Sequence, residues 1–399
     1  MSSIQECVKE NDVTFLKFRI SPGMCSQKDL DLGLMQAAKL GFVDCVKCLL
    51  EAGADINYTN MSCYTPLLTA VKFNKVSVVR LLLENKADPN FRSGLNMTSL
   101  LIAAQWGYSD IVDLLLKYRA SILSRDVEGN TALILSSRNG HYMAMRSLLD
   151  AGCDVNATNN EGCTSLHYAC HKARGYQMLL DAGANPDIAD KDSVTPLLMA
   201  ASEGFDKVVK ALVEAKCNVN IPNESVKRTA LHILSFKGHT ESIDYLVYGG
   251  ANIDACDTYN RSPLWYAIQN KKVNVVRLLL KAYSHVDTFQ CPGKSSEDCP
   301  AKLAFEQKQF DIIKFFLLTG YDHDHVRECI LADEHSDWLK SNPEYEHWLE
   351  FGSSAQTLKQ LCRKWIRHYL GRQFYHHLQF LSIPEVMKNY LFLEELHDH

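Results

Sequence analysis

The residues of this chain whose spacing could support chemistry are two pairs of cysteine and histidine. Cys45 and Cys48 form a Cys-x-x-Cys pair, a spacing used for thiol redox chemistry and for binding metals. His167 and His171 stand four residues apart, which is one helical turn and suits two zinc ligands. Neither pair has a second pair of ligands close by. Cys45 and Cys48 also align with Ile111 and Leu114 in a similar stretch further along the chain, so we interpret both as core residues.

Other motifs of catalysis are missing from the sequence. It contains no phosphate-binding loop, no nucleophile elbow and no HExxH helix. The remaining clusters of potential ligands are interpreted as linker or surface residues: His323, His325, Cys329, His376 and His377. We expect a protein that is not an enzyme and holds no cofactor and no metal.

Composition narrows the class of protein further. The chain has 399 residues, is 46% hydrophobic and carries a formal charge of −5, so it has no general attraction to nucleic acid or membranes. Residues 1–10 lack a secretory pattern, and no apolar run is long enough to span a bilayer. Fourteen scattered cysteines then indicate reduced thiols. We expect a cytoplasmic protein, with the nucleus as a second location.

A repeated unit is the main feature of the sequence. Similar strings begin at Thr65, Thr98, Thr131, Thr164, Thr195, Thr229 and Ser262, at intervals of 33, 33, 33, 31, 34 and 33 residues. A period near 33 with a T-P-L-H-x-A core resembles the ankyrin repeat. The sequence therefore predicts an all-α solenoid of about nine helix-turn-helix repeats.

The local chemistry of the unit fits this interpretation. Thr can cap the first helix, and Pro suits its first position. Nine residues after the Thr stands a glycine in most units, or Asn74 in one, where a turn with positive φ is needed. The unit at Thr164 has lost two residues between its helices, which predicts a kink or a shortened helix there.

Four regions follow from this pattern: 1–29 is a cap or flexible segment, 30–325 the repeat array, 326–350 a helical linker and 351–399 a terminal domain. Residues 322–350 hold nine Asp/Glu and two Lys/Arg, whereas 351–384 hold five Lys/Arg and no Asp/Glu. The two segments either pack together or form two solvated faces.

The terminal domain begins with an amphipathic helix over 357–370. Leu358, Cys362 and Ile366 follow the spacing [Ser/Thr/Pro]-Leu-x-x-x-Cys-x-x-x-[aliphatic], which resembles the elongin-binding half of a SOCS box. Leu381–Pro384 resembles the cullin-selecting Leu-Pro-x-Pro motif that follows, but has Ser382 in place of the first proline. With the repeats, the chain resembles the ankyrin-repeat and SOCS-box family.

This resemblance implies a three-helix SOCS box and a role as the substrate-recognition subunit of a ubiquitin ligase. Its partners would be elongin C, elongin B, cullin-5 with its RING subunit, and an unidentified target protein that is ubiquitinated and degraded. The elongin-binding residues would be Leu358, Leu361, Cys362 and Ile366, and the cullin-binding residues Leu381, Ile383 and Pro384. The alternative is a plain ankyrin scaffold whose terminal helix is only a cap.

The target would contact the ends of the first helices and the hairpins before them. Aromatic residues are unexpected at such exposed positions and are enriched at interaction hot spots. The candidate substrate-binding residues are Tyr64, Phe73, Met97, Trp106 and Phe236. The alternative is that these side chains lean on neighbouring repeats.

Overall fold

The fold was taken from a computed structural model, which describes residues 4–20, 25–282 and 300–319. Within these ranges the regular structure is helical, and twenty helices follow one another along the chain. The predicted linker and the predicted SOCS box at 351–399 lie outside the described residues.

The chain divides into two compact units, Met1–Lys191 and Asp192–His399. In unit 1 the helices are α1 (Ile4–Lys9), α2 (Val13–Arg19), α3 (Gln27–Leu40), α4 (Val43–Glu51), α5 (Pro66–Lys72), α6 (Val76–Glu84), α7 (Ser99–Trp106), α8 (Ser109–Lys117), α9 (Ala132–Asn139), α10 (Tyr142–Asp150), α11 (Ser165–Lys172) and α12 (Tyr176–Asp181). In unit 2 they are α13 (Pro196–Glu203), α14 (Asp206–Glu214), α15 (Ala230–Lys237), α16 (Thr240–Tyr248), α17 (Pro263–Gln269), α18 (Val273–Lys281), α19 (Pro300–Glu306) and α20 (Phe310–Thr319).

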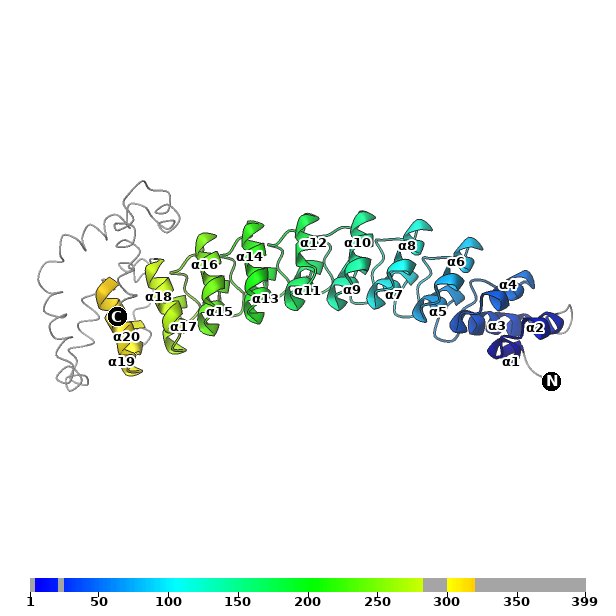
Figure 1. The fold of residues 1–399 in the computed structure, drawn as a ribbon, viewed down its shortest axis with the longest axis horizontal. Helices are drawn as coiled ribbons and strands as arrows, with labels where there is room; N and C mark the ends of the chain where they lie inside the picture. Colours follow the sequence, from blue (N-terminus) through cyan, green and yellow to red (C-terminus); the bar gives the residue numbers. More distant parts are fainter. Residues whose placement is uncertain (1–3, 21–24, 283–299, 320–399) are drawn as a thin grey trace, which may run out of the picture. The chain divides into compact units, whose positions relative to one another are not determined.

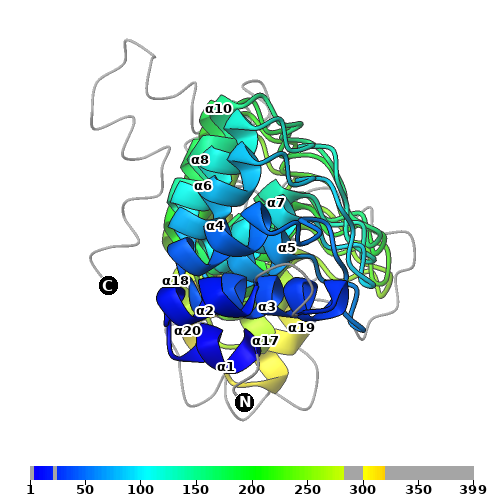
Figure 2. The same cartoon turned by 90° about the vertical axis from the view of Figure 1, so that its right-hand side faces the viewer.

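From α3 onward the described helices form nine antiparallel pairs, which confirms the predicted all-α repeat fold. Within unit 1 the first helices α3, α5, α7, α9 and α11 pack side by side in one row (Figure 1). The second helices α4, α6, α8 and α10 form another row, and the hairpin loops lie together on one side (Figure 2). The same neighbour-to-neighbour packing joins α13, α15, α17 and α19 in unit 2.

The first helices α5 and α7 begin as the sequence predicts. The Oγ1 atoms of Thr65 and Thr98 accept hydrogen bonds from the backbone N–H three residues on, at 3.2 and 3.4 Å. Pro66 occupies the first position of α5, where its missing N–H costs nothing. The backbone nine residues after the Thr is left-handed, with φ of 73° at Gly107 and 54° at Asn74. These caps set the length of α5 and α7.

Apolar side chains from both rows fill the core. Leu67, Leu68 and Val71 of α5 are at most 1% exposed, as are Val79 and Leu82 of α6. Burial of each such side chain stabilises the fold by roughly 1.5–3 kcal/mol. Because each repeat lacks enough apolar surface of its own, this core forms only between neighbouring repeats.

Two local features depart from the regular pattern. The second helix of the fifth pair, α12, has six residues where most second helices have nine, which confirms the predicted shortening. Ala173 takes the usual glycine place there, with φ of 52°. At the other end of unit 1, α1 and α2 precede the repeats, with Val8 and Leu16 fully buried.

Candidate protein-binding surface

The candidate aromatic residues stand where α5, α7 and α15 end. Phe73 follows α5 and is 42% exposed, and Trp106 is the last residue of α7 and is 57% exposed. Phe236, in α15 of unit 2, is 51% exposed. Tyr64 and Met97, just before α5 and α7, are half-buried. Their contact with a target remains a proposal.

Lysine side chains lie over two aromatic rings in unit 1. The Lys39 Nζ atom is 5.2 Å from the centre of the Phe73 ring, and the Lys72 Nζ atom is 4.8 Å from the centre of the Tyr64 ring. At this range a cation is attracted to the face of the ring. Sequence reasoning missed Lys39. Aligning the first repeat on Gly41 would have placed Lys39 in register with Lys72.

The hairpins next to this surface are rigid because buried or half-buried polar side chains bond their backbones. Asn60 Oδ1 accepts hydrogen bonds from the N–H groups of Ser62 and Tyr64, at 3.0 and 2.9 Å. Asp126 does the same for Glu128 and Asn130, at 2.9 and 2.8 Å. Such turns order the loop before any partner binds.

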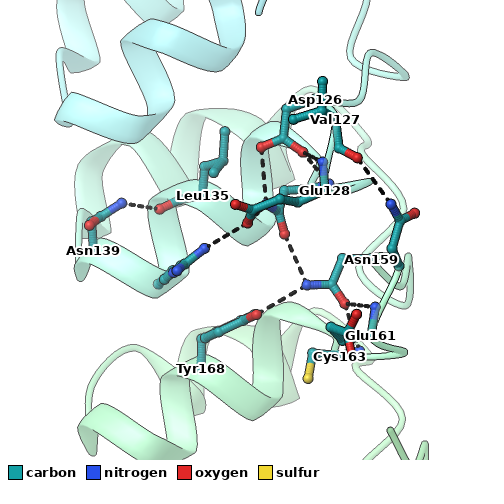
Figure 3. A network of polar contacts seen from close by, with 12 residues as sticks. Asp126, Val127, Glu128, Leu135, Asn139, Asn159, Glu161, Cys163 and Tyr168 are labelled. Carbon is teal, nitrogen blue, oxygen red and sulfur yellow. Dashed lines mark hydrogen bonds and ion pairs between the residues drawn. The ribbon is translucent and has the colours of Figure 1, made fainter. Parts of the chain in front are cut away.

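One network joins two successive hairpins of unit 1 (Figure 3). Asn159 Nδ2 donates to Asn130 Oδ1 at 3.0 Å and to the Tyr168 hydroxyl at 3.0 Å. At the exposed edge, Arg138 Nη1 donates to Glu128 Oε2 at 3.1 Å, and both side chains are about half exposed. An exposed pair of this kind contributes roughly 0–1 kcal/mol. The buried amides therefore do more to hold the hairpins in register.

Unit 2 has a second polar cluster, which lies beneath Phe236. Asp257 is 4% exposed, and its Oδ2 accepts a hydrogen bond from the Tyr266 hydroxyl at 2.6 Å. Arg228 Nη2 donates to that same hydroxyl at 2.6 Å, while its Nε lies 3.6 Å from Asp257 Oδ2. Phe236 packs edge-on against Tyr266, with ring centres 6.3 Å apart. The exposed aromatic residue therefore also leans on the next repeat.

The acid–base properties of this cluster are set by burial and hydrogen bonds. Burial alone would raise the pKa of Asp257, but bonds from Tyr266 and from the N–H groups of Arg261 and Tyr259 outweigh it and lower that pKa. Burial and the bond to Asp257 raise the pKa of Tyr266. The His232 ring packs edge-on against Tyr266, with ring centres 5.9 Å apart, and burial lowers its pKa to about 4. At neutral pH the cluster thus holds a charged Asp257 and a neutral His232.

Of the residues considered for thiol and metal chemistry, Cys45, Cys48 and His167 are buried, whereas His171 is exposed. Cys45 and Cys48 on α4 are 0% and 6% exposed, which confirms their prediction as core residues. Burial raises the pKa of Cys45 to about 11, so its thiol stays protonated. His167 is fully buried, with its Nδ1 accepting from the Thr164 N–H at 3.0 Å.

Two further observations concern the whole described part of the chain. It contains no group of three or more His, Cys, Asp or Glu side chains placed to hold a metal ion. No helix within it has both the length and the apolar character needed to cross a membrane.

The residues predicted to bind elongin and cullin, at 358–384, lie outside the described residues, so their roles remain predictions. These residues are included in a comparison of the sequence with known protein families. The profile of ankyrin repeats matches overlapping stretches between residues 6 and 290, which is most of the chain. The profile of the SOCS box matches residues 354–391. The chain belongs to the ankyrin-repeat and SOCS-box family.

Individual proteins are similar to parts of this chain. Ankyrin repeat and SOCS box protein 5 of Mus musculus is 32% identical over 169 residues, which is 42% of this chain and 49% of that protein. The B-cell lymphoma 3 protein homolog of Mus musculus is 30% identical over 149 residues, or 36% of this chain and 33% of that protein. The matched region thus spans about half or less of these relatives.

Solved structures resemble the repeats as well. The crystal structure of the ankyrin repeat domain of Bcl-3 aligns with a TM-score of 0.49 and 29% identity, covering 54% of this chain and 98% of that one. An ankyrin repeat domain from Acinetobacter baumannii aligns with a TM-score of 0.45 and 33% identity, covering 46% of this chain and 98% of that one.

Proposed function

We propose that the protein is the substrate-recognition subunit of a ubiquitin ligase built on elongin B, elongin C, cullin-5 and a RING subunit. The SOCS-box match at residues 354–391, joined to an ankyrin array in one chain, is the observation that carries the proposal. The array would hold the target protein, and the box would connect it to the ligase. The target would then be ubiquitinated and degraded by the proteasome.

Catalysis belongs to the partners in this proposal. The chain contributes proximity, which raises the local concentration of target lysines near the charged conjugating enzyme. None of its side chains acts as acid, base or nucleophile. The expected location, the cytoplasm with the nucleus as a second site, is part of the same proposal.

Within the SOCS box we assign the contact with elongin C to one face of a helix. Leu358, Cys362 and Ile366 recur every four residues, as anchors of a helix in an apolar groove do, and Leu361 lies beside them in sequence. One buried Leu side chain contributes roughly 1.5–3 kcal/mol, which is about tenfold or more in affinity. Leu381, Ile383 and Pro384 are assigned to cullin-5.

Co-expression with elongins B and C tests the elongin assignment. We expect a stoichiometric complex that is lost on Leu358→Asp or Cys362→Arg, because each change puts a charge into an apolar groove. Gln360→Asp is the matched control, since residue 360 lies off the face of the anchors. If Leu358→Asp and Gln360→Asp capture equal amounts of elongin C, the plain ankyrin scaffold is the correct interpretation.

Cullin capture tests the second half of the box. The double change Ile383→Ala and Pro384→Ala should weaken co-purification of cullin-5 and leave elongin capture intact. Simultaneous loss of both partners would show that residues 381–384 are not a separate cullin contact.

A further inference from the structure

We propose that the first-helix face of unit 1 binds an acidic, extended segment of the target protein that also carries apolar side chains. This inference rests on the proposed function, since it names the class of target. The surface consists of the two residues that lie seven and eight positions after the Thr place in each of the five repeats. These are Lys39, Leu40, Lys72, Phe73, Gln105, Trp106, Arg138, Asn139, His171 and Lys172, called the cationic stripe below.

Charge is the first observation behind this inference. The cationic stripe holds four Lys or Arg side chains and no Asp or Glu. The helices α5, α7, α9 and α11 contain no carboxylate at all, whereas each second helix from α4 to α12 contains at least one. Carboxylates are thus absent from four of the five first helices of unit 1, whereas α3 carries Asp29 and Asp31 near its N-terminal end, away from Lys39.

The cations of the cationic stripe are mostly left without counter-charges. Lys39, Lys72 and Lys172 are exposed and have no carboxylate partner among the described residues. Arg138 is offset by Glu128 at 3.1 Å. Lys39 and Lys72 instead lie over the rings of Phe73 and Tyr64, contacts that leave the ammonium charge in place.

Apolar surface accompanies this charge. Phe73 and Trp106 are 42% and 57% exposed, in adjacent repeats. Trp is the residue most enriched at interface hot spots, and a ring beside an ammonium group suits a ligand that offers both a carboxylate and an apolar side chain. The corresponding positions of unit 2 hold the exposed Phe236 beside Lys237, but they also hold the carboxylate of Glu203.

The spacing of the repeats suits an extended chain. Packed helices lie roughly 8–10 Å apart, and an extended chain advances about 3.3 Å per residue, so one repeat corresponds to about three residues. A segment with a carboxylate and an apolar residue in every three would meet the cationic stripe in register. A protein segment is favoured over nucleic acid because the whole chain carries a charge of −5.

The test uses the full chain and a fluorescein-labelled peptide of repeated Glu-Ser-Leu triplets, about 15 residues long to span five repeats. We expect fluorescence anisotropy to report binding that weakens at least tenfold between about 50 mM and 500 mM salt. Peptides of Lys-Ser-Leu and of Glu-Ser-Gly triplets should bind at least tenfold more weakly. If either binds as well as the Glu-Ser-Leu peptide, the inference is wrong.

Variants locate the binding. Lys39→Glu with Lys72→Glu should weaken binding of the Glu-Ser-Leu peptide at least tenfold, and Trp106→Ala roughly tenfold. Lys47→Glu with Lys117→Glu, on α4 and α8, changes the net charge equally on the other row of helices and should change binding less than twofold. All four positions are exposed lysines, so circular dichroism should show unchanged folding. Equal effects of the two double variants would overturn the inference.

Two other results are informative. If the chain binds a single-stranded oligothymidine more tightly than the Glu-Ser-Leu peptide, the surface binds nucleic acid and the inference is wrong. Elongin capture is measured separately through Leu358. If the chain captures elongin C but does not bind the Glu-Ser-Leu peptide, only the proposed class of target is wrong. If it binds the peptide but does not capture elongin C, only the ligase assignment is wrong.

Discussion

Protonation of His232 is expected to destabilise the repeat formed by α15 and α16. His232 Nδ1 accepts a hydrogen bond from the backbone N–H of Thr229 at 3.2 Å and lies 2.9 Å from the Thr229 Oγ1. Its Nε2 lies 3.1 Å from the carbonyl oxygen of Arg261 in the next hairpin. Because Nδ1 must accept, Nε2 carries the proton and donates to that carbonyl. A second proton on Nδ1 would face the Thr229 N–H.

The size of the effect follows from the pKa values. Burial lowers the pKa of His232 from 6.5 to about 4 in the folded protein. A lowered histidine pKa means that the folded state binds fewer protons than the unfolded state. The contribution of neutral His232 to the free energy of unfolding is therefore fully present above pH 6.5 and is lost as the pH falls toward 4. Between pH 7.5 and pH 5 the expected loss is about 2 kcal/mol.

Hydrogen exchange of the α15 amide groups measures this loss locally. After correction for intrinsic exchange rates, protection should fall about 30-fold from pH 7.5 to pH 5. The matched control is His232→Leu, because Leu68 and Leu101 occupy the same position in other repeats and donate their N–H groups to the capping threonines. In that variant Thr229 can cap in the same way, and the fall should be much smaller.

The comparison between the two proteins decides the outcome. Other groups also titrate in this pH range, but they are shared by the wild type and the His232→Leu variant. An equal loss of α15 protection in both proteins would refute the assignment of the pH dependence to His232. Greater protection of the wild type at pH 5 than at pH 7.5 would reverse the sign of the argument.

The remaining predictions concern stability at neutral pH. Ala173→Gly should stabilise unit 1 by roughly 0.5–1 kcal/mol, because glycine adopts the positive φ of 52° without strain. The matched control Ala182→Gly, at φ of −81°, should be destabilising, and urea midpoints that move in the same direction would contradict the argument. Asp257→Ala should cost roughly 1.5–3 kcal/mol, because it leaves the Tyr266 hydroxyl without its charged acceptor, while the partly exposed Arg228 stays solvated. Tyr266→Phe removes one donor and should cost about 1 kcal/mol by the same urea measurement, and an equal cost for both changes would argue against a buried charge at Asp257.

The repeat fold could be predicted well from the sequence because its determinants are local. The capping Thr98, the left-handed Gly107 and the buried Leu residues between them all belong to α7 and the two residues that flank it. The shortened α12 was also predictable, since a loss of two residues has to be taken from a helix or a loop. Such features need only the order of residues within one repeat.

The candidate surface was predicted only in part. Phe73 and Trp106 stood out as aromatic residues at exposed positions, but Lys39 did not, because its aromatic partner comes from the next repeat.

The sequence by itself determined the helix pairs, their caps and their order, because each depends on contacts within about one repeat length. The tertiary structure decided what happens between repeats of the same unit. It brought Arg228, Asp257 and Tyr266 into one hydrogen-bonded cluster. It also placed Lys39 over Phe73, with Trp106 exposed in the next repeat. Residues some 30 positions apart become neighbours only when helices stack. Which charged residues share one face is therefore decided by the packing of the repeats.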